Sequence, residues 1–233
     1  MSDLPILLLH GALGSADQLS PLEESLANQF LVYRLGFSGH AGKPLPDVPF
    51  GNEIFAQDVV KFLDQQQIKK AHIFGHSMGG YVGLYVAHHF SDRIASVFTL
   101  GTKWDWTPEV VAREVKMLNP EKMEEKVPRF ADLLASRHAP VDWKEIVRRT
   151  ARMMQEFGNG AGLTEADFRS LHIPVSIGIG ELDNMVSLEE SRRIAEWLPK
   201  GKLAYFEGVK HPIEKMDVQR LARSISESIQ SGR

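Results

Sequence analysis

Residues 73–83, which read IFGHSMGGYVG, constrain the fold more than any other part of the chain. Four glycines lie between an apolar run typical of a buried strand and a segment with the spacing of a helix. Each glycine inside a helix costs about 1 kcal/mol relative to alanine, so these positions need a structural reason. Gly75 and Gly79 flank Ser77 in the G-x-S-x-G pattern of a sharp strand-to-helix turn, which leaves no room for neighbouring side chains. The stretch therefore predicts a strand, a tight turn that exposes Ser77, and a helix.

Short apolar runs alternate with longer helical stretches along the chain, which favours parallel strands joined by crossover helices. Six strands are expected at residues 6–9, 30–35, 71–74, 94–100, 175–179 and 202–206. Helices are expected at about 18–28, 52–67, 78–90, 187–198 and 214–230. The pattern predicts an α/β fold with six parallel strands in the order 2-1-3-4-5-6, helices on both faces and right-handed crossovers.

About seventy residues separate the fourth expected strand from the fifth, far more than one crossover helix needs. Three helix-start signals lie in this interval: Thr107-Pro108, Asp142-x-x-Glu145 and Thr164-x-x-Asp167. We therefore expect a core made of residues 1–101 and 171–233, with a helical cap inserted at residues 102–170. The alternative is that the insertion is only additional scaffold.

A serine at neutral pH is a poor nucleophile unless a base lies within hydrogen-bond reach and an acid orients that base. Asp183 follows the fifth expected strand after a glycine-rich turn, and His211 follows the sixth. The carboxyl ends of parallel strands meet at one edge of a sheet, where open α/β sheets place their sites. We expect Ser77, Asp183 and His211 to meet there as nucleophile, acid and base. Asp105, which follows the fourth strand, is the less favoured alternative for the acid.

The oxyanion of a tetrahedral intermediate requires preorganised N–H donors. Met78 follows the nucleophile at the start of a helix, and we expect its backbone N–H to be one donor. The second is expected from the loop after the first strand, at Ala12, with Leu13 as the alternative and as a substrate contact. Trp104 and Trp106, just after the fourth strand, are further expected substrate contacts, although packing within the cap could claim them instead.

Composition narrows the possible partners. The formal net charge of −3 gives no reason to expect nucleic acid or a membrane surface as a partner, and the chain has no cysteine. Its nine histidines show no metal-ligand spacing, and no dinucleotide-binding glycine motif is present. Residues 5–9 are interpreted as a buried strand and not as a signal peptide. We expect a cytoplasmic protein with a small-molecule substrate and neither metal nor cofactor.

Four stretches, LLLHGALGS, GHSMGG, IPVSIGIGELDNMV and GVKHPIEKMD, occur in the order typical of one family. Through them the chain resembles the α/β-hydrolase superfamily over nearly its whole length, as a serine esterase-like member with a helical cap. The resemblance implies Ser77 as nucleophile, Asp183 as acid, His211 as base and a cap at about 102–170.

The chain also departs from that family. Members usually have two strands before the strand that ends in His-Gly, so we expect a sheet trimmed to six strands. In the loop RLGFSGHAGKP, Gly36 stands where many members have an aspartate, so no role is carried over from that loop. His40 is interpreted as a loop stabiliser, and His10 as a structural hydrogen-bonding residue.

The sequence thus predicts a serine hydrolase that cleaves a small carboxylic ester or thioester through an acyl-enzyme intermediate. A cap rich in Trp and Met should favour short acyl groups of about two to six carbons. Two alternatives remain open. One is a carbon–carbon bond hydrolase or a cofactor-free lyase on the same three residues, and the other is a non-catalytic small-molecule receptor.

Overall fold

A computed structural model describes residues 4–232 and shows a six-stranded sheet. Its strands are β1 (Ile6–Leu9), β2 (Val32–Leu35), β3 (Ala71–His76), β4 (Ile94–Leu100), β5 (Val175–Gly180) and β6 (Gly201–Phe206). All five strand pairs are parallel, in the order β2-β1-β3-β4-β5-β6, which confirms the predicted sheet. β2 begins two residues later than expected, because the Phe30 N–H is hydrogen-bonded to the Leu26 carbonyl in the preceding turn.

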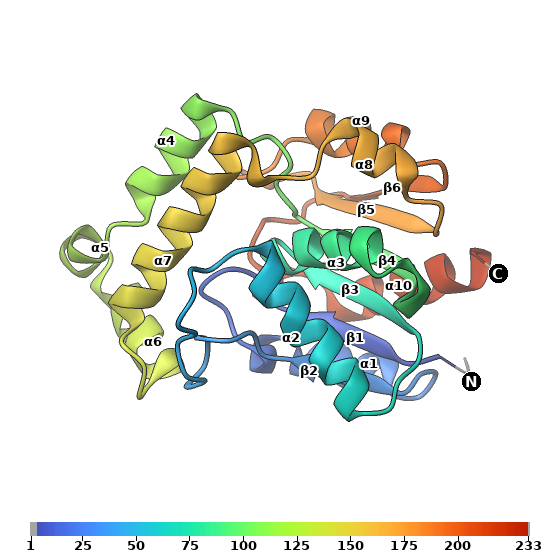
Figure 1. Ribbon diagram of the computed structural model, residues 1–233, viewed down its shortest axis with the longest axis horizontal. Helices are drawn as coiled ribbons and strands as arrows, with labels where there is room; N and C mark the ends of the chain where they lie inside the picture. The colour runs from blue at the N-terminus through green and yellow to red at the C-terminus, as the bar shows by residue number, and fades with distance from the viewer. Residues whose placement is uncertain (1–3, 233) are drawn as a thin grey trace.

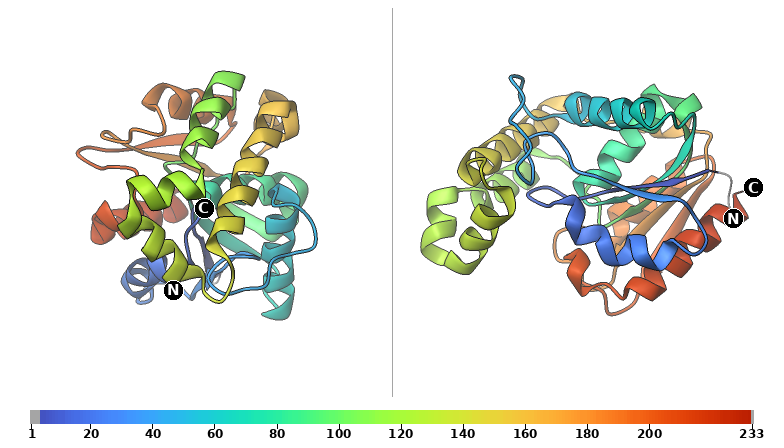
Figure 2. Two further views of the ribbon diagram at one scale, coloured as in Figure 1. Left: turned by 90° about the vertical axis from the view of Figure 1, so that its left-hand side faces the viewer. Right: turned by 90° about the horizontal axis from the view of Figure 1, so that it is seen from below.

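Helices cover both faces of the sheet, as predicted (Figures 1 and 2). One face carries α1 (Ser20–Leu26) and α10 (Val218–Ser231), and the other carries α2 (Asn52–Gln65), α3 (Met78–His89) and α9 (Leu188–Trp197). Short helical turns lie at Ala16–Leu19, Ser91–Arg93 and Ile213–Lys215.

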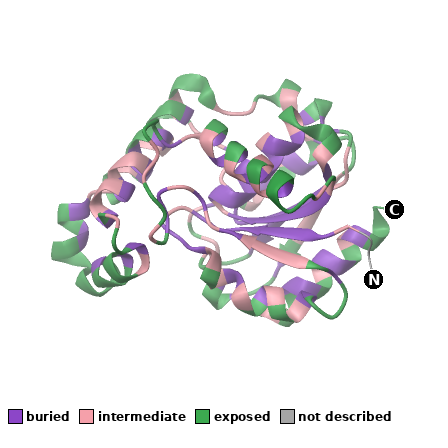
Figure 3. Ribbon diagram, turned by 60° about the horizontal axis from the view of Figure 1, so that its bottom comes forward, coloured by how far each residue is buried: buried purple, intermediate pink, exposed green. Residues whose placement is uncertain are grey.

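The side-chain alternation of the strands explains these two layers. In β1, Leu7 and Leu9 pack into the core under α2 and α3, whereas Ile6 and Leu8 pack into the core under α1 and α10. Successive side chains of a strand point to opposite faces, so a run of apolar residues fills both cores. The four residues of β1 are all buried (Figure 3). β1 therefore lies in the core between the two helical layers.

The segment between β4 and β5 is helical. It contains α4 (Pro108–Met117), α5 (Pro120–Lys126), α6 (Pro128–His138), α7 (Trp143–Glu156), a π-helical turn (Phe157–Ala161) and α8 (Glu165–Ser170). Helices α4 to α7 stand apart from the sheet, on the side away from the two chain ends (Figure 1). Within residues 4–232, no helix is long and apolar enough to cross a membrane.

The predicted helix-start signals in this segment are all present, with one difference. The Thr107 side chain accepts a hydrogen bond from the Val110 N–H. Thr164 and Asp167 form a reciprocal capping box. The Asp142 side chain instead caps its helix through the Lys144 N–H, without the reciprocal contact that a capping box requires.

Helix α8, at the end of the expected cap at residues 102–170, packs on helices that cover the sheet. It lies against α3 and α9. Phe168, at its centre, is buried and packs edge-on to Trp104 and beside Trp197. The inserted chain therefore returns to the sheet before α8, and only α4 to α7 form the separate layer.

Candidate active site

The turn between β3 and α3 holds Ser77 in a strained conformation. Its φ is 51° and its ψ is −118°, in a region that residues other than glycine rarely adopt. A Cβ atom at Gly75 would lie 2.3 Å from the backbone of Gly79, and one at Gly79 would lie 2.4 Å from the Leu9 carbonyl oxygen. The glycines therefore permit the close approach of β3, α3 and β1 that makes the turn possible.

Hydrogen bonds from the neighbouring strand fix this turn. The Ser77 N–H donates to the Leu100 carbonyl at 2.8 Å, and the Thr102 hydroxyl donates to the Ser77 carbonyl at 2.9 Å. Both partners come from the end of β4 or the loop after it. The serine side chain is left at the wall of a cavity.

His211 and Asp183 are paired at the carboxyl ends of β6 and β5. The His211 Nδ1 lies 2.8 Å from the Asp183 Oδ2. The other oxygen, Oδ1, accepts the backbone N–H groups of Met185 and Val186, both at 2.9 Å. An ionised carboxylate can only accept hydrogen bonds, so Nδ1 of His211 must carry the ring proton. Nε2 of the neutral ring is then free to accept a proton.

Burial raises the pKa of the Asp183 carboxyl, but the hydrogen bond and charge of His211 outweigh it, so the pKa lies below its usual value. Asp183 is therefore ionised at neutral pH. The alternative acid, Asp105, forms an ion pair with Arg193. Among the described residues, it is Asp183 that the structure brings to the His211 ring.

His76 is a buried neighbour that the sequence pattern did not single out. Its Nε2 lies 3.0 Å from the His211 carbonyl oxygen, so it donates there and supports the backbone of that residue. Burial, aided by the charge of His211, lowers the pKa of His76 to about 4, which keeps it neutral. The only sequence signal for this contact is its position directly before Ser77.

The loop after β1 brings Ala12 to the same cavity. The Gly11 carbonyl oxygen is held by the His10 Nδ1 at 2.8 Å and by the Gly14 N–H at 3.1 Å. In a trans peptide the carbonyl and the following N–H point in opposite directions. The two hydrogen bonds to the Gly11 carbonyl oxygen therefore also fix the direction of the Ala12 N–H. Met78, the first residue of α3, has an N–H at a helix start, where the helix itself provides no acceptor.

His10 and His40, interpreted from the sequence as a structural residue and a loop stabiliser, are both hydrogen-bonded to backbone groups. His10 is fully buried, and its Nε2 accepts the Phe37 N–H at 3.1 Å. Burial is the main cause that lowers the pKa of His10 to about 4. His40 is also buried, and its Nδ1 is bonded to the Ser38 carbonyl at 3.1 Å.

Helix α6 is attached to the same loop through Leu13, which has a φ of 57°. The Leu13 carbonyl oxygen accepts the Arg137 Nη1 at 2.9 Å and the His138 Nε2 at 3.1 Å. The His138 Nδ1 accepts the Ala41 N–H at 3.0 Å, so the ring proton must sit on Nε2. The separate helical layer is thereby tied to the loop that carries Ala12.

The cavity has two joined parts. A cleft of about 660 Å³ extends along α4 and α6, and a narrow recess of about 40 Å³ lies beside it. Both parts are lined by one shared set of residues: Ala12, Ser77, Glu114, Met154, Met185 and His211. The two spaces therefore meet at the serine and the histidine.

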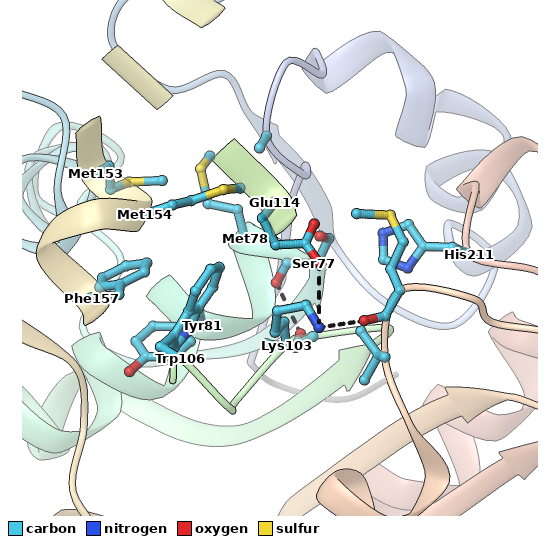
Figure 4. A pocket seen from close by; sticks show the side chains of 14 residues that line it. Ser77, Met78, Tyr81, Lys103, Trp106, Glu114, Met153, Met154, Phe157 and His211 are labelled. Carbon is cyan, nitrogen blue, oxygen red and sulfur yellow. Dashed lines mark hydrogen bonds and ion pairs between the residues drawn. The ribbon is translucent and has the colours of Figure 1, made fainter. Parts of the chain in front are cut away.

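The walls of the recess are mostly apolar. Tyr81, Trp106, Met153 and Phe157 line it, from α3, the loop after β4, α7 and the turn that follows it (Figure 4). Leu13 lines the larger cleft. Trp104 does not appear in either lining, and its indole packs between Tyr81 and Phe168, with ring centroids 5.6 Å away in each case.

Two charged residues also line the recess, and the sequence pattern gave no sign of them. They are Lys103, in the loop after β4, and Glu114, on α4. Their contact depends on how α4 docks over the sheet. Within residues 4–232, no group of three His, Asp or Glu side chains is placed to hold a metal ion.

Known proteins resemble this chain in sequence and in structure. Residues 5–160 match the family described as alpha/beta hydrolase fold. Esterase YbfF of Escherichia coli (strain K12) is 40% identical over 90 residues, which cover 39% of this chain and 35% of that protein. The chain thus aligns with only about a third of that esterase's length.

Two further comparisons cover more of the chain. The putative carbamate hydrolase RutD of Caulobacter sp. (strain K31) is 26% identical over 221 residues, which cover 85% of this chain and 80% of the relative. The structure of a thermophilic esterase from Thermogutta terrifontis superposes with a TM-score of 0.78 at 21% identity, covering 98% of this chain and 90% of that one. The structural likeness confirms the predicted fold class.

Proposed function

This chain belongs to the alpha/beta hydrolase family, and we propose that it is a serine hydrolase that cleaves a small carboxylic ester or thioester. The observation that carries the proposal is the hydrogen-bonded pair of His211 and Asp183, whose histidine lines the same cavity as the strained Ser77. The similarity to a protein named an esterase supports the same reaction class.

In the proposed mechanism the His211 Nε2 takes the proton of the Ser77 hydroxyl while the serine oxygen attacks the substrate carbonyl carbon. Asp183 holds the proton on Nδ1 and stabilises the imidazolium that forms. The backbone N–H groups of Ala12 and Met78 donate to the negatively charged carbonyl oxygen of the tetrahedral intermediate.

Collapse of this intermediate breaks the bond to the leaving oxygen or sulfur, which receives the proton from the His211 Nε2. The product of this half-reaction is an acyl ester of Ser77. Water then enters, gives one proton to His211 and attacks the acyl carbon. Breakdown of the second tetrahedral intermediate returns that proton to the serine and releases the carboxylic acid.

The two parts of the cavity suggest how a substrate is divided between them. We place the acyl group in the recess that Tyr81 and Phe157 help to line, because that space is narrow and mostly apolar. The leaving group then occupies the larger cleft along α4 and α6. We further propose that α4 to α7, within the expected cap at residues 102–170, act as that cap and exclude long acyl chains.

The test is a series of p-nitrophenyl esters with acyl chains of two to twelve carbons, with Ser77→Ala as the control. We expect kcat/KM to be highest between two and six carbons, because a longer chain must displace the cap. The Ser77→Ala variant should lose turnover for every ester. A phenyl carbamate is a useful added substrate, since one relative is named a putative carbamate hydrolase. A profile that rises steadily to twelve carbons would refute the acyl-recess assignment, and turnover that survives Ser77→Ala would refute the mechanism.

A further inference from the structure

A pair of opposite charges lies in the mostly apolar recess beside Ser77. The side chains of Lys103 and Glu114 are only 10% and 3% exposed, and both residues line the recess. Figure 4 shows the lysine ammonium and the glutamate carboxylate directed toward each other, among the side chains that surround the nucleophile. The pair joins the loop after β4 to helix α4.

This pair leaves hydrogen-bonding capacity unused. The Lys103 Nζ is 3.8 Å from the Glu114 Oε1, beyond hydrogen-bond distance. The ammonium donates to the Met185 carbonyl, but it has three donors. The same Oε1 accepts the Arg113 Nη2 at 3.3 Å. Within residues 4–232, the second oxygen, Oε2, has no hydrogen-bond donor.

Another buried carboxylate shows what a purely structural role looks like in this protein. Both oxygens of Glu190 are engaged, since Oε1 accepts the Trp104 N–H and Oε2 accepts the N–H and the hydroxyl of Ser187. Burying charges is costly unless hydrogen bonds satisfy them, and a loose ion pair does not repay that cost. Within residues 4–232, hydrogen bonds therefore satisfy Glu114 less completely than Glu190.

We propose that Lys103 and Glu114 select an acyl group that carries an uncharged polar substituent, either a hydroxyl or an amide. Such a group can accept a hydrogen bond from the ammonium and donate one to the free oxygen of the carboxylate. This proposal rests on the proposed function, because it places the acyl group in the recess.

The opposite signs of the pair argue against the other acyl chemistries. A carboxylate on the substrate would be attracted by Lys103 but repelled by Glu114, and an ammonium would be attracted by Glu114 but repelled by Lys103, so neither is compatible with both residues. An unsubstituted alkyl chain would remove water from both charges without replacing its hydrogen bonds. A neutral group that both donates and accepts is the one that satisfies the two residues together.

The activity test compares methyl butyrate with methyl 2-hydroxybutyrate and methyl 3-hydroxybutyrate by titration of the released acid. We expect kcat/KM for one of the hydroxy esters to exceed that for methyl butyrate by about tenfold or more, since a hydrogen bond to a charged group has that effect. Monomethyl succinate and methyl 4-aminobutyrate should react more slowly than methyl butyrate. Equal rates for the hydroxylated and plain esters would overturn the proposal.

The variant test removes both charges at once. Lys103→Met or Glu114→Leu alone leaves a lone buried charge and can fail to fold, whereas the double variant replaces the pair with apolar side chains of similar size. The double variant should lose the preference for hydroxy esters and gain activity on methyl butyrate. Lys116→Met on the exposed part of α4 is the matched control and should keep the preference of the wild type. A double variant that retains the preference would also overturn the proposal.

A binding measurement separates this proposal from the proposed function. In the Ser77→Ala protein, the fluorescence of the tryptophans, which include the recess residue Trp106, should respond to the hydroxy ester at roughly tenfold lower concentration than to methyl butyrate. Selective binding without any Ser77-dependent hydrolysis would support the polar recess and refute the hydrolase. Ser77-dependent hydrolysis without selectivity in rate or binding would refute the polar recess alone.

Discussion

Replacing Asp183 by asparagine should abolish most of the activity through a change of tautomer. The Asp183 Oδ1 accepts two backbone N–H groups, from Met185 and Val186. In Asp183→Asn the amide oxygen must remain with these donors, so the amide NH₂ takes the place of Oδ2, 2.8 Å from the His211 Nδ1. The imidazole must then accept at Nδ1 and carry its proton on Nε2. In that form it cannot take the serine proton.

The wrong tautomer lowers kcat by about 10⁴-fold in a serine protease, and we expect a loss of that order here, equivalent to about 5.4 kcal/mol in the barrier. The loss should appear in kcat with little change in KM, because the shape of the cavity is kept. The assay is steady-state hydrolysis of a short p-nitrophenyl ester, with circular dichroism melting to verify the fold.

Asp105→Asn is the matched control, because Asp105 follows β4 and pairs with Arg193 on the surface. We expect its activity to stay within a few-fold of the wild type. The assignment of the acid is wrong if kcat falls about 10⁴-fold in Asp105→Asn while Asp183→Asn keeps more than a tenth of the wild-type activity.

Three further predictions follow from geometry and burial. Gly79→Ala should lower the free energy of unfolding in urea by about 3 kcal/mol or fail to fold, because the new methyl would lie 2.4 Å from a carbonyl oxygen; wild-type stability would contradict the tight turn. Trp106→Ala should move the ester chain-length optimum to longer acyl groups, whereas Trp104→Ala should mainly reduce stability, and a shift with Trp104→Ala alone would reverse this assignment. Burial lowers the pKa of His10 and of His76 to about 4, whereas the unfolded chain titrates near 6.5, so only the unfolded state gains protons as the pH falls below that value. The free energy of unfolding should therefore be at its maximum above about pH 6.5 and should fall toward pH 4, by about 2 kcal/mol for each histidine at pH 5. Equal urea midpoints at pH 5 and 7.5 would show that these rings are not buried in the neutral form.

The sheet was predictable because each buried strand is a compact apolar run bounded by glycine or by a helical pattern. The location of Asp183 and His211 was predictable for a related reason, since both follow such runs at the same edge of the sheet. The contacts of Lys103 and Glu114 could not be predicted from the sequence, because they depend on how α4 packs over the sheet. Local periodicity does not specify that packing.

Trp104 and Trp106 show a second limit of sequence reasoning. They lie in a segment without helical or strand geometry, so no period predicts which of them turns toward the cavity. Packing decides this, with Trp104 against Tyr81 and Phe168 and Trp106 against Phe157 at the recess.

The two donors that α6 places on the Leu13 carbonyl restrict how this protein can be re-engineered or can diverge. Grafting a foreign set of helices in place of α4 to α7 would remove Arg137 and His138 together. The Leu13 carbonyl would then lose both side-chain donors, and the loop that carries Ala12 would lose its attachment to the helical layer. A chimera of this kind should bind new substrates before it can turn them over. Inheritance of these two side chains, or of equivalents on the incoming helix, is therefore a condition for exchanging α4 to α7 while the loop that carries Ala12 keeps its attachment.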